Sequence, residues 1–222
     1  MYKTFLVITG VELEQRTLLD RKVVSSAGYG KYKSKIEVKR YIKVKPDCII
    51  SFGFAGSTSE KINCSDIIIP EKILSKNGYV ETVSEVYRNF FEKKLGKSNF
   101  KNSNLYSSDQ IVDTTQKKRT ILKEYDASAV DMESASIQKI ANKNKIPFVC
   151  IRVILDNQST NIPRELDGII NKTSKVSTIK LFRLLIFKPL ILFSLMKISF
   201  YFFKSYLTLR HVSKNIFEKK LL

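Results

Sequence analysis

The sequence predicts an α/β domain over residues 1–170, in which a mixed central sheet is flanked by helices, and a helical C-terminal extension over residues 171–222. Three observations predict this fold. Several short runs are almost continuously apolar, which is typical of strands that are covered on both faces. Segments with helical periodicity separate these runs. The chain has 222 residues, of which 43% are hydrophobic, and this is enough for one domain with a sizeable core.

Four apolar runs are expected to form buried parallel strands. They are Thr4–Thr9, Cys48–Phe52, Ile67–Pro70 and Phe148–Ile154.

Two helices are expected in the same region. The first lies between Glu133 and Lys145, because Ile137, Ile140 and Ala141 fall on one of its faces. The second lies at Glu85–Lys94, within a polar stretch, Asn77–Asn104, that is otherwise expected to be connecting structure.

The segment Ile179–Leu209 is rich in Phe, Leu and Ile but is repeatedly interrupted by Lys and Arg. Its longest uncharged stretch, Pro189–Met196, is too short to span a bilayer, which takes about 20 apolar residues. We expect two helices separated at Pro189. Such helices suit either an anionic membrane surface or packing on the core or on a second subunit, and composition leaves both interpretations open.

Charge and cysteine content limit the classes of partner. The net charge is +18, and residues 171–222 hold 11 Lys and Arg against one acid, Glu218, so 10 of these charges lie in the extension. An anionic membrane surface suits this excess. Nucleic-acid binding is disfavoured, because the basic residues alternate with aliphatic side chains rather than with exposed aromatic ones.

Three cysteines without a CxxC pair, together with one histidine, predict no metal site and a reduced, cytoplasmic location.

Two acids are expected at the ligand-binding edge of the sheet. Glu133 stands at the start of the predicted helix, and Asp156 follows the last predicted strand. Ligands of open α/β sheets bind at the carboxyl ends of the strands. There one carboxylate could accept hydrogen bonds from ribose hydroxyls, and the other could protonate a leaving base. The structural alternatives are a helix-start acid for Glu133 and a cap for Asp156.

Residues 128–157, SAVDMESASIQKIANKNKIPFVCIRVILDN, resemble the signature of the nucleoside phosphorylase superfamily. They are similar above all to methylthioadenosine/S-adenosylhomocysteine nucleosidases and hopanoid-associated phosphorylases. A second block, Lys45–Glu71, resembles the glycine turn of that family and the strand after it. A third and less specific block is Ala27–Lys31. In order and spacing, the resemblance covers roughly residues 3–160.

The resemblance implies roles for five residues that would contact the nucleoside. Met132 and Glu133 would hold the ribose, and Glu133 would bind its 2′ and 3′ hydroxyls. Asp156 would protonate N7 of the base or donate a hydrogen bond to it. Ile111 and Val112 match the place where the family packs the purine ring, although a short apolar strand is the simpler interpretation of this pair.

Three further residues are implied near the attacking group. Glu14 matches the acid that positions the attacking water in the nucleosidases; an exposed acid in a first helical turn is the alternative. Gly53 and Gly56 would let the backbone approach the sugar or the attacking group.

The sequence also departs from the family pattern. Phe54 stands where many members have a small residue, and Leu155 replaces the serine that commonly orients the catalytic aspartate. The arginines that bind phosphate in phosphorylases are not evident, and Arg16 is the nearest candidate.

The predicted function is cleavage of the N-glycosidic bond of a purine nucleoside, with adenine as the expected base and phosphate or water as the acceptor. No metal or organic cofactor is expected, and inorganic phosphate would be a co-substrate only. Adenosylhopane is a candidate substrate, because the basic, apolar extension is also similar to that of the hopanoid-associated branch. The alternatives are a soluble methylthioadenosine/S-adenosylhomocysteine nucleosidase and a catalytically silent, membrane-associated nucleoside-binding protein. A homo-oligomer in the cytoplasm is expected, with the inner face of the membrane as a candidate location.

Overall fold

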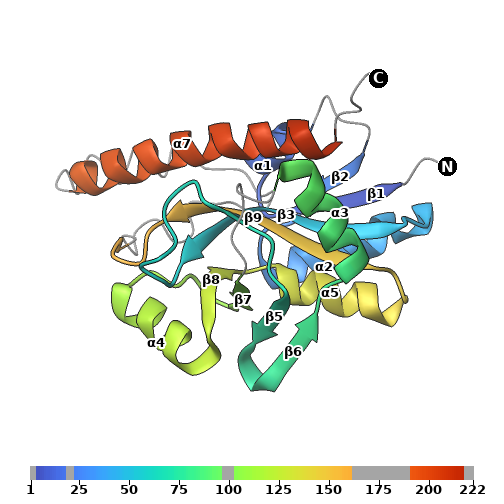
Figure 1. Cartoon of the computed structure of the whole chain (residues 1–222), viewed down its shortest axis with the longest axis horizontal. Helices are drawn as coiled ribbons and strands as arrows, with labels where there is room; N and C mark the ends of the chain where they lie inside the picture. The colour runs from blue at the N-terminus through green and yellow to red at the C-terminus, as the bar shows by residue number, and fades with distance from the viewer. Residues whose placement is uncertain (1–3, 19–22, 97–102, 162–190, 218–222) are drawn as a thin grey trace.

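The computed structural model describes residues 4–18, 23–96, 103–161 and 191–217. Within these ranges the chain forms one mixed sheet of nine strands with helices on both faces (Figure 1). The predicted α/β class is therefore confirmed. The strands are β1 (Phe5–Thr9), β2 (Val24–Ala27), β3 (Cys48–Ser57), β4 (Ile67–Ile68), β5 (Lys72–Ser75), β6 (Tyr79–Thr82), β7 (Asn104–Ser107), β8 (Ala127–Asp131) and β9 (Phe148–Asp156).

The sheet follows the order β2-β1-β3-β8-β7-β5-β6, and β9 pairs with both β3 and β4. Neighbours β1 and β2, β1 and β3, β3 and β9, β5 and β7, and β7 and β8 are parallel. The pairs β3–β8, β4–β9 and β5–β6 are antiparallel. The long strands β3 and β9 run side by side at the centre, so their carboxyl ends reach the same edge of the sheet.

The four predicted strands correspond to β1, β3, β4 and β9, with two corrections. The run at Ile67–Pro70 is not a parallel strand: only Ile67–Ile68 is extended in the ladder, and it pairs antiparallel to β9. The strand predicted at Cys48–Phe52 continues to Ser57, because the glycines that resemble a turn remain paired with β9 and β8.

The helices are α1 (Glu12–Arg16), α2 (Gly30–Tyr41), α3 (Glu85–Leu95), α4 (Thr115–Tyr125), α5 (Ser134–Lys143) and α7 (Ile191–Phe217), with short 3-10 turns η1 (Ile42–Val44) and η2 (Lys76–Gly78). The two helices expected from periodicity are α3 and α5. The stretch Asn77–Asn104 is more than connecting structure, because β6 forms a hairpin with β5 inside it.

Alternate residues of the central strands feed two apolar layers. Phe5 and Val7 of β1 point into the layer that contains Phe91 of α3 and Leu209 of α7. Leu6 and Ile8 point into the opposite layer, which contains Val38 of α2 and Ile137 and Ile140 of α5. Burial on both faces explains why these strands are continuously apolar in sequence.

The second half of α7 packs on the domain, where it crosses one face of the sheet near α3 (Figure 1). Leu209, Val212, Ile216 and Phe217 are buried in the core. Ser205 donates to the carbonyl oxygen of Ile154 at 2.6 Å, and Ser213 donates to that of Thr17 at 2.6 Å. Pro189 and the first predicted tail helix lie outside the described residues. In the part of the chain that is described, no helix has the length and apolarity needed to cross a membrane.

Candidate active site

The carboxyl ends of the central strands bring the predicted acids to one edge of the sheet. Asp156 ends β9, and its register partner on β3 is Gly56. Gly56 also pairs with Val130 of β8, and Met132 and Glu133 follow directly after that strand. The strand order therefore gathers residues from the two sequence blocks that are far apart along the chain.

Glu133 is buried and stands immediately before α5. It is the N-cap residue of that helix, so the alternative of a helix-start acid describes its position correctly, although its side chain makes no capping hydrogen bond. Instead, Oε1 accepts a hydrogen bond from the backbone N–H of Gly30 at 2.8 Å. Burial raises the pKa of Glu133 to about 8; the Asp131 and Glu14 carboxyls add to the rise, while Arg152 opposes it.

Glu14 is buried in α1, so the alternative of an exposed helix acid is wrong. Oε2 accepts from the backbone N–H groups of Gly10 at 2.6 Å and Val11 at 2.9 Å, and Oε1 accepts from Phe54 N–H at 2.7 Å. Burial raises the pKa of Glu14, whereas Arg152 and these three amides lower it. The carboxyl is thus held in one orientation by the backbone on two sides.

Glycines make room for two of the acids, Glu14 and Glu133. A Cβ on Gly10 would lie 3.2 Å from Glu14 Oε2 and 3.3 Å from Glu133 Oε1, so this glycine stands between the two carboxyls. A Cβ on Gly53 would overlap the carboxyl of Glu14, 2.6 Å from its Cδ. The backbone at Gly53 thus lies against the carboxyl of Glu14, and its approach to the sugar or the attacking group stays a prediction.

Asp156 is buried, and its side chain accepts a hydrogen bond from a buried lysine of α4, Lys118. The same ammonium donates to the carbonyl oxygens of Asn157 at 2.9 Å and Thr160 at 2.8 Å. Burial raises the pKa of Asp156, and the Lys118 charge and hydrogen bond lower it. A capping role for Asp156 is not supported, because no backbone N–H of the described residues donates to its carboxyl. The sequence did not indicate Lys118.

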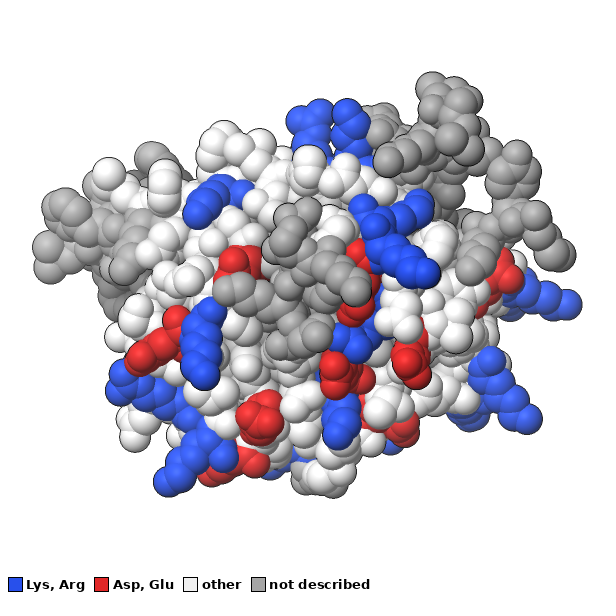
Figure 2. All heavy atoms as spheres, viewed as in Figure 1, with Lys and Arg blue, Asp and Glu red and all other residues white. Residues whose placement is uncertain are grey.

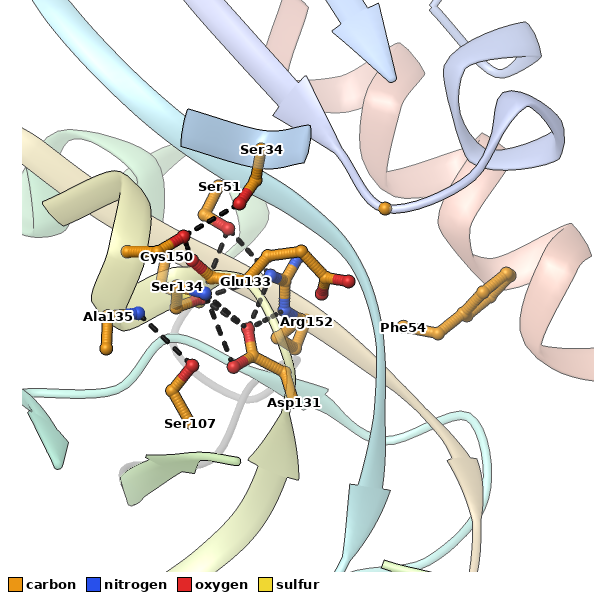
Figure 3. Close-up of polar contacts among 12 residues, drawn as sticks. Ser34, Ser51, Phe54, Ser107, Asp131, Glu133, Ser134, Ala135, Cys150 and Arg152 are labelled. Atoms are coloured by element: carbon orange, nitrogen blue, oxygen red, sulfur yellow. Dashed lines mark hydrogen bonds and ion pairs between the residues drawn. The ribbon is translucent and has the colours of Figure 1, made fainter. Parts of the chain in front are cut away.

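A buried ion pair between Arg152 and Asp131 lies beside Glu133 (Figure 3). Arg152 contacts Asp131 Oδ2 at 2.6 Å through NH2 and at 3.0 Å through Nε, and it also donates to Ser51 Oγ at 2.6 Å. Ser134 Oγ donates to the same Asp131 oxygen. Figure 3 shows this network beside Glu133, whose carboxyl points away from it. Asp131 and Arg152 both lie within residues 128–157, the stretch that resembles the superfamily signature. An arginine inside an apolar strand indicates a buried charge that needs an ionic partner.

Two outer groups complete the neighbourhood. The Tyr29 hydroxyl donates to Met132 Sδ at 3.9 Å, so the third sequence block lies next to the site. Ile111 and Val112 are half-buried between β7 and α4, and Val112 packs on the cluster that contains Tyr106 and Ile121. Their contact with a purine ring stays a prediction.

The side chains of Phe54 and Arg16 lie away from the three acids. The Phe54 ring packs against Phe202 of α7, with ring centroids 5.6 Å apart, and Figure 3 shows it directed away from Glu133. Arg16 is exposed and lies 3.6 Å from Glu12, which leaves it at the surface. Across the described ranges, no cluster of three His, Cys, Asp or Glu side chains could hold a metal ion.

A cavity of about 360 Å³ adjoins the site at Met132. Its floor includes Ser107, Ala135 and Ser136, and four lysines line it, namely Lys31, Lys35, Lys76 and Lys139. Lys31 is paired with Asp109 at 2.9 Å. This volume could receive part of a small ligand.

Comparison with known proteins identifies the family. The family model of the phosphorylase superfamily matches residues 9–185. The chain belongs to this superfamily. Among its relatives, the 5′-methylthioadenosine/S-adenosylhomocysteine nucleosidase of Buchnera aphidicola (subsp. Acyrthosiphon pisum, strain Tuc7) is 31% identical over 173 residues, which cover 67% of this chain and 75% of the relative. The nucleosidase of that name from Desulfotalea psychrophila is 30% identical over 149 residues, covering 58% of this chain and 64% of the relative.

Solved structures share the fold of this superfamily member. Futalosine hydrolase of Helicobacter pylori superposes with a TM-score of 0.72 at 16% identity, covering 96% of this chain and 97% of the other. A mutant of the Helicobacter pylori nucleosidase with 5′-methylthioadenosine in its active site gives a TM-score of 0.67 at 17% identity, covering 83% and 99%. Its family and these relatives show that the chain is an enzyme that cleaves nucleosides.

Proposed function

We propose that the chain hydrolyses the N-glycosidic bond of a purine ribonucleoside, with adenine as the expected base. The observation that carries this proposal is the pair of buried carboxyls, Glu14 and Glu133, on either side of Gly10. A third buried carboxyl, Asp156, stands at the end of the neighbouring strand. The relatives named as 5′-methylthioadenosine/S-adenosylhomocysteine nucleosidases support the same reaction.

The three acids divide the work of hydrolysis. Glu133 accepts hydrogen bonds from the ribose 2′ and 3′ hydroxyls, which favours its ionised form. Asp156 gives a proton to N7, so that the base departs as a neutral molecule. The sugar becomes cation-like as the bond breaks, and water adds to C1′. Glu14 holds that water and takes its proton.

Water is favoured over phosphate because Glu14 occupies the space beside Gly53 with an acidic group. Among the described cations near the site, Arg152 is bound to Asp131 and Lys118 to Asp156. A phosphate beside Glu14 would meet a carboxyl, and neither of these two cations is free to offset the repulsion.

Glu133→Gln tests this proposal through the substrate's hydroxyls. The loss of kcat/KM should be about 10- to 100-fold greater for adenosine derivatives than for their 2′-deoxy counterparts, because the deoxy sugar lacks one donor to the carboxylate. Glu85→Gln, on the exposed first turn of α3, is the matched control and should leave both values unchanged. Equal losses on both sugars would contradict a ribose contact.

A second candidate function, action on an apolar nucleoside such as adenosylhopane at a membrane, is favoured by the outer surface of α7. Four of its apolar side chains are exposed at helical spacing: Met196 at 60%, Phe200 at 66%, Phe203 at 62% and Leu207 at 49%. These residues recur every three or four positions and so form one stripe on the helix. The stripe needs a partner, since apolar surface of this kind marks an interaction site.

Charge favours an anionic lipid surface as that partner. The helix has no acidic residue between Ile191 and Phe217, and Lys204, Arg210 and Lys214 are exposed on it. Figure 2 shows Lys and Arg with uncharged residues along the upper margin of the molecule, where α7 lies, and acidic side chains below it. The basic residues would repel a second copy of α7 but attract anionic headgroups.

Vesicle binding separates this candidate from a nucleosidase without a membrane role. The full chain should co-sediment with phosphatidylglycerol vesicles but not with phosphatidylcholine vesicles, and salt should weaken the binding. The double change Phe200→Ser and Phe203→Ser should abolish binding, whereas Ile36→Ser, an exposed apolar residue of α2, should not. A double variant that binds vesicles as the wild type does would refute the lipid contact. A concentration-dependent dimer lost in the same variant would assign the stripe to a second copy instead.

A further inference from the structure

Lys118 is fully buried, in contrast to its neighbour Lys117, which is exposed and pairs with Asp113. An ammonium has three N–H donors. All three of Lys118 are used: one on Asp156 Oδ2, one on the Asn157 carbonyl and one on the Thr160 carbonyl. Burying a lysine is costly unless its charge is paired and its donors are satisfied, so this arrangement specifies the position of the ammonium closely.

The contact distinguishes the two oxygens of Asp156. Oδ2 is held by Lys118, whereas no donor among the described residues reaches Oδ1. Oδ1 lies on the side of Gly56, 3.1 Å from the position that a Cβ would take there. Leu155, the preceding residue, has no polar group that could orient the carboxyl. The contact that orients the carboxyl comes instead from Lys118 on helix α4.

We propose that Lys118 is a positioning residue, which holds Asp156 by Oδ2 so that Oδ1 is presented to N7 of the purine. The inference rests on the proposed hydrolysis. In the reaction step, the proton moves from Oδ1 to N7, and the electron pair of the bond from C1′ to the base goes to the base. Asp156 is left as a carboxylate, which the ammonium stabilises. Lys118 itself neither gains nor loses a proton.

The electrostatics of the pair agree with this role. Burial alone raises the pKa of Asp156, which would make it a weaker acid, and Lys118 opposes that rise. Among the described residues, Lys118 on α4 is the charged group that faces Asp156. The neighbouring strands contribute uncharged residues there, Gly56 from β3 and Val130 from β8. Removing the cation should therefore shift the titration of the acid as well as its orientation.

Lys118→Met tests the inference in the full-length protein, with Lys117→Met as the matched control. With an adenosine derivative as substrate, kcat should fall by no more than the roughly 10²–10⁴-fold that the general acid contributes, while KM changes little. The high-pH limb of the rate profile should move up by about 1–3 pH units, because an adjacent opposite charge lowers a carboxyl pKa by that amount. Lys117→Met should match the wild type in both readouts.

The decisive comparison is the double variant of Lys118→Met with Asp156→Asn. If Lys118 acts through Asp156, the double variant is no slower than Asp156→Asn alone. The inference would be overturned if the losses of kcat in the two single variants multiply in the double variant. It would also be overturned if the high-pH limb of the rate profile of Lys118→Met stays where it is in the wild type. Either result leaves the proposed hydrolysis standing. If Lys118→Met does not fold, Lys118→Arg replaces it: the retained charge should keep the pH limb in place while turnover falls, and a moved limb would overturn the role. A wild-type chain that releases no base would refute the proposed function and this inference with it.

Discussion

The buried Glu133 carboxyl should make the stability of the free enzyme depend on pH. Its pKa is raised from the ordinary 4.5 to about 8, first by burial and then by the Asp131 carboxyl. Below the ordinary value, the group is protonated in both the folded and the unfolded chain. As the pH rises toward 8, the unfolded chain loses the proton while the folded chain keeps it, so the free energy of unfolding decreases.

The size of this effect follows from the shift. Each pH unit between the two pKa values changes the free energy of unfolding by about 1.4 kcal/mol, so the whole interval from 4.5 to about 8 corresponds to on the order of 5 kcal/mol. Glu133→Gln removes the titrating group. Any difference in packing or hydrogen bonding that the amide introduces is independent of pH and shifts the whole curve equally.

Urea titrations at several values between about pH 5 and pH 8 measure this dependence in the absence of ligand. The stability of the wild type should decrease relative to that of Glu133→Gln as the pH rises, by on the order of 4 kcal/mol across the window. Glu85→Gln, a change on the exposed surface of α3, should run parallel to the wild type. Parallel curves for Glu133→Gln and the wild type would refute the argument that burial holds the proton on Glu133.

Three further substitutions address the other groups of the site. Asp156→Asn should lower turnover by about 10²–10⁴-fold with the fold intact, as steady-state rates and circular dichroism would measure, and an active variant would exclude Asp156 as the acid. Gly53→Ala places a Cβ against the carboxyl of Glu14, so it should cost about 1–3 kcal/mol in thermal unfolding and reduce turnover; an unchanged enzyme would contradict the close approach. Asp131→Asn leaves Arg152 buried without its ionic partner and should cost about 3–5 kcal/mol in denaturant unfolding, whereas a loss below 1 kcal/mol would show that the pair is dispensable.

The central strands could be predicted from the sequence, because a strand that is covered on both faces has to be apolar on both. The edge of the sheet could not. In β6 the exposed residues alternate with half-buried ones, and Val80 is 52% exposed, so this strand lacks a continuous apolar run. It is extended because it pairs with β5, and that pairing is a tertiary contact.

The position of Glu133 and Asp156 at one edge of the sheet could also be predicted, since both belong to a recognisable motif, and Glu14 matches one position of the family. Lys118 could not. It lies beside Lys117 in a lysine-rich helix, TQKKRTILKEY, and only the packing of α4 decides which of the two ammonium groups is buried. Asp131 and Arg152 stand in the motif itself, but their pairing depends on the adjacency of β3, β8 and β9.

The surroundings of α7 could be predicted only in part. The density of Phe, Leu and Ile among Lys and Arg suited either a membrane surface or packing on the core or on a second subunit, and Phe200 and Phe203 are exposed. The same composition could not indicate that Leu209, Val212 and Ile216 pack against the sheet. Packing on the core, one of the interpretations that the sequence left open, therefore holds for the second part of this helix, and contact with a membrane surface stays a prediction.

Product analysis is the most direct test of the claim that Glu14, Glu133 and Asp156 hydrolyse a purine nucleoside. The purified chain is incubated with adenosine, 5′-methylthioadenosine, S-adenosylhomocysteine and a 5′-alkyl adenosine, each with and without phosphate. The released base and sugar are then identified by mass spectrometry in ¹⁸O-labelled water. Free adenine and a sugar that carries one ¹⁸O at C1′, in equal yield with and without phosphate, is the predicted result. A sugar 1-phosphate formed only when phosphate is present, or no release of base from any of the four, would contradict it.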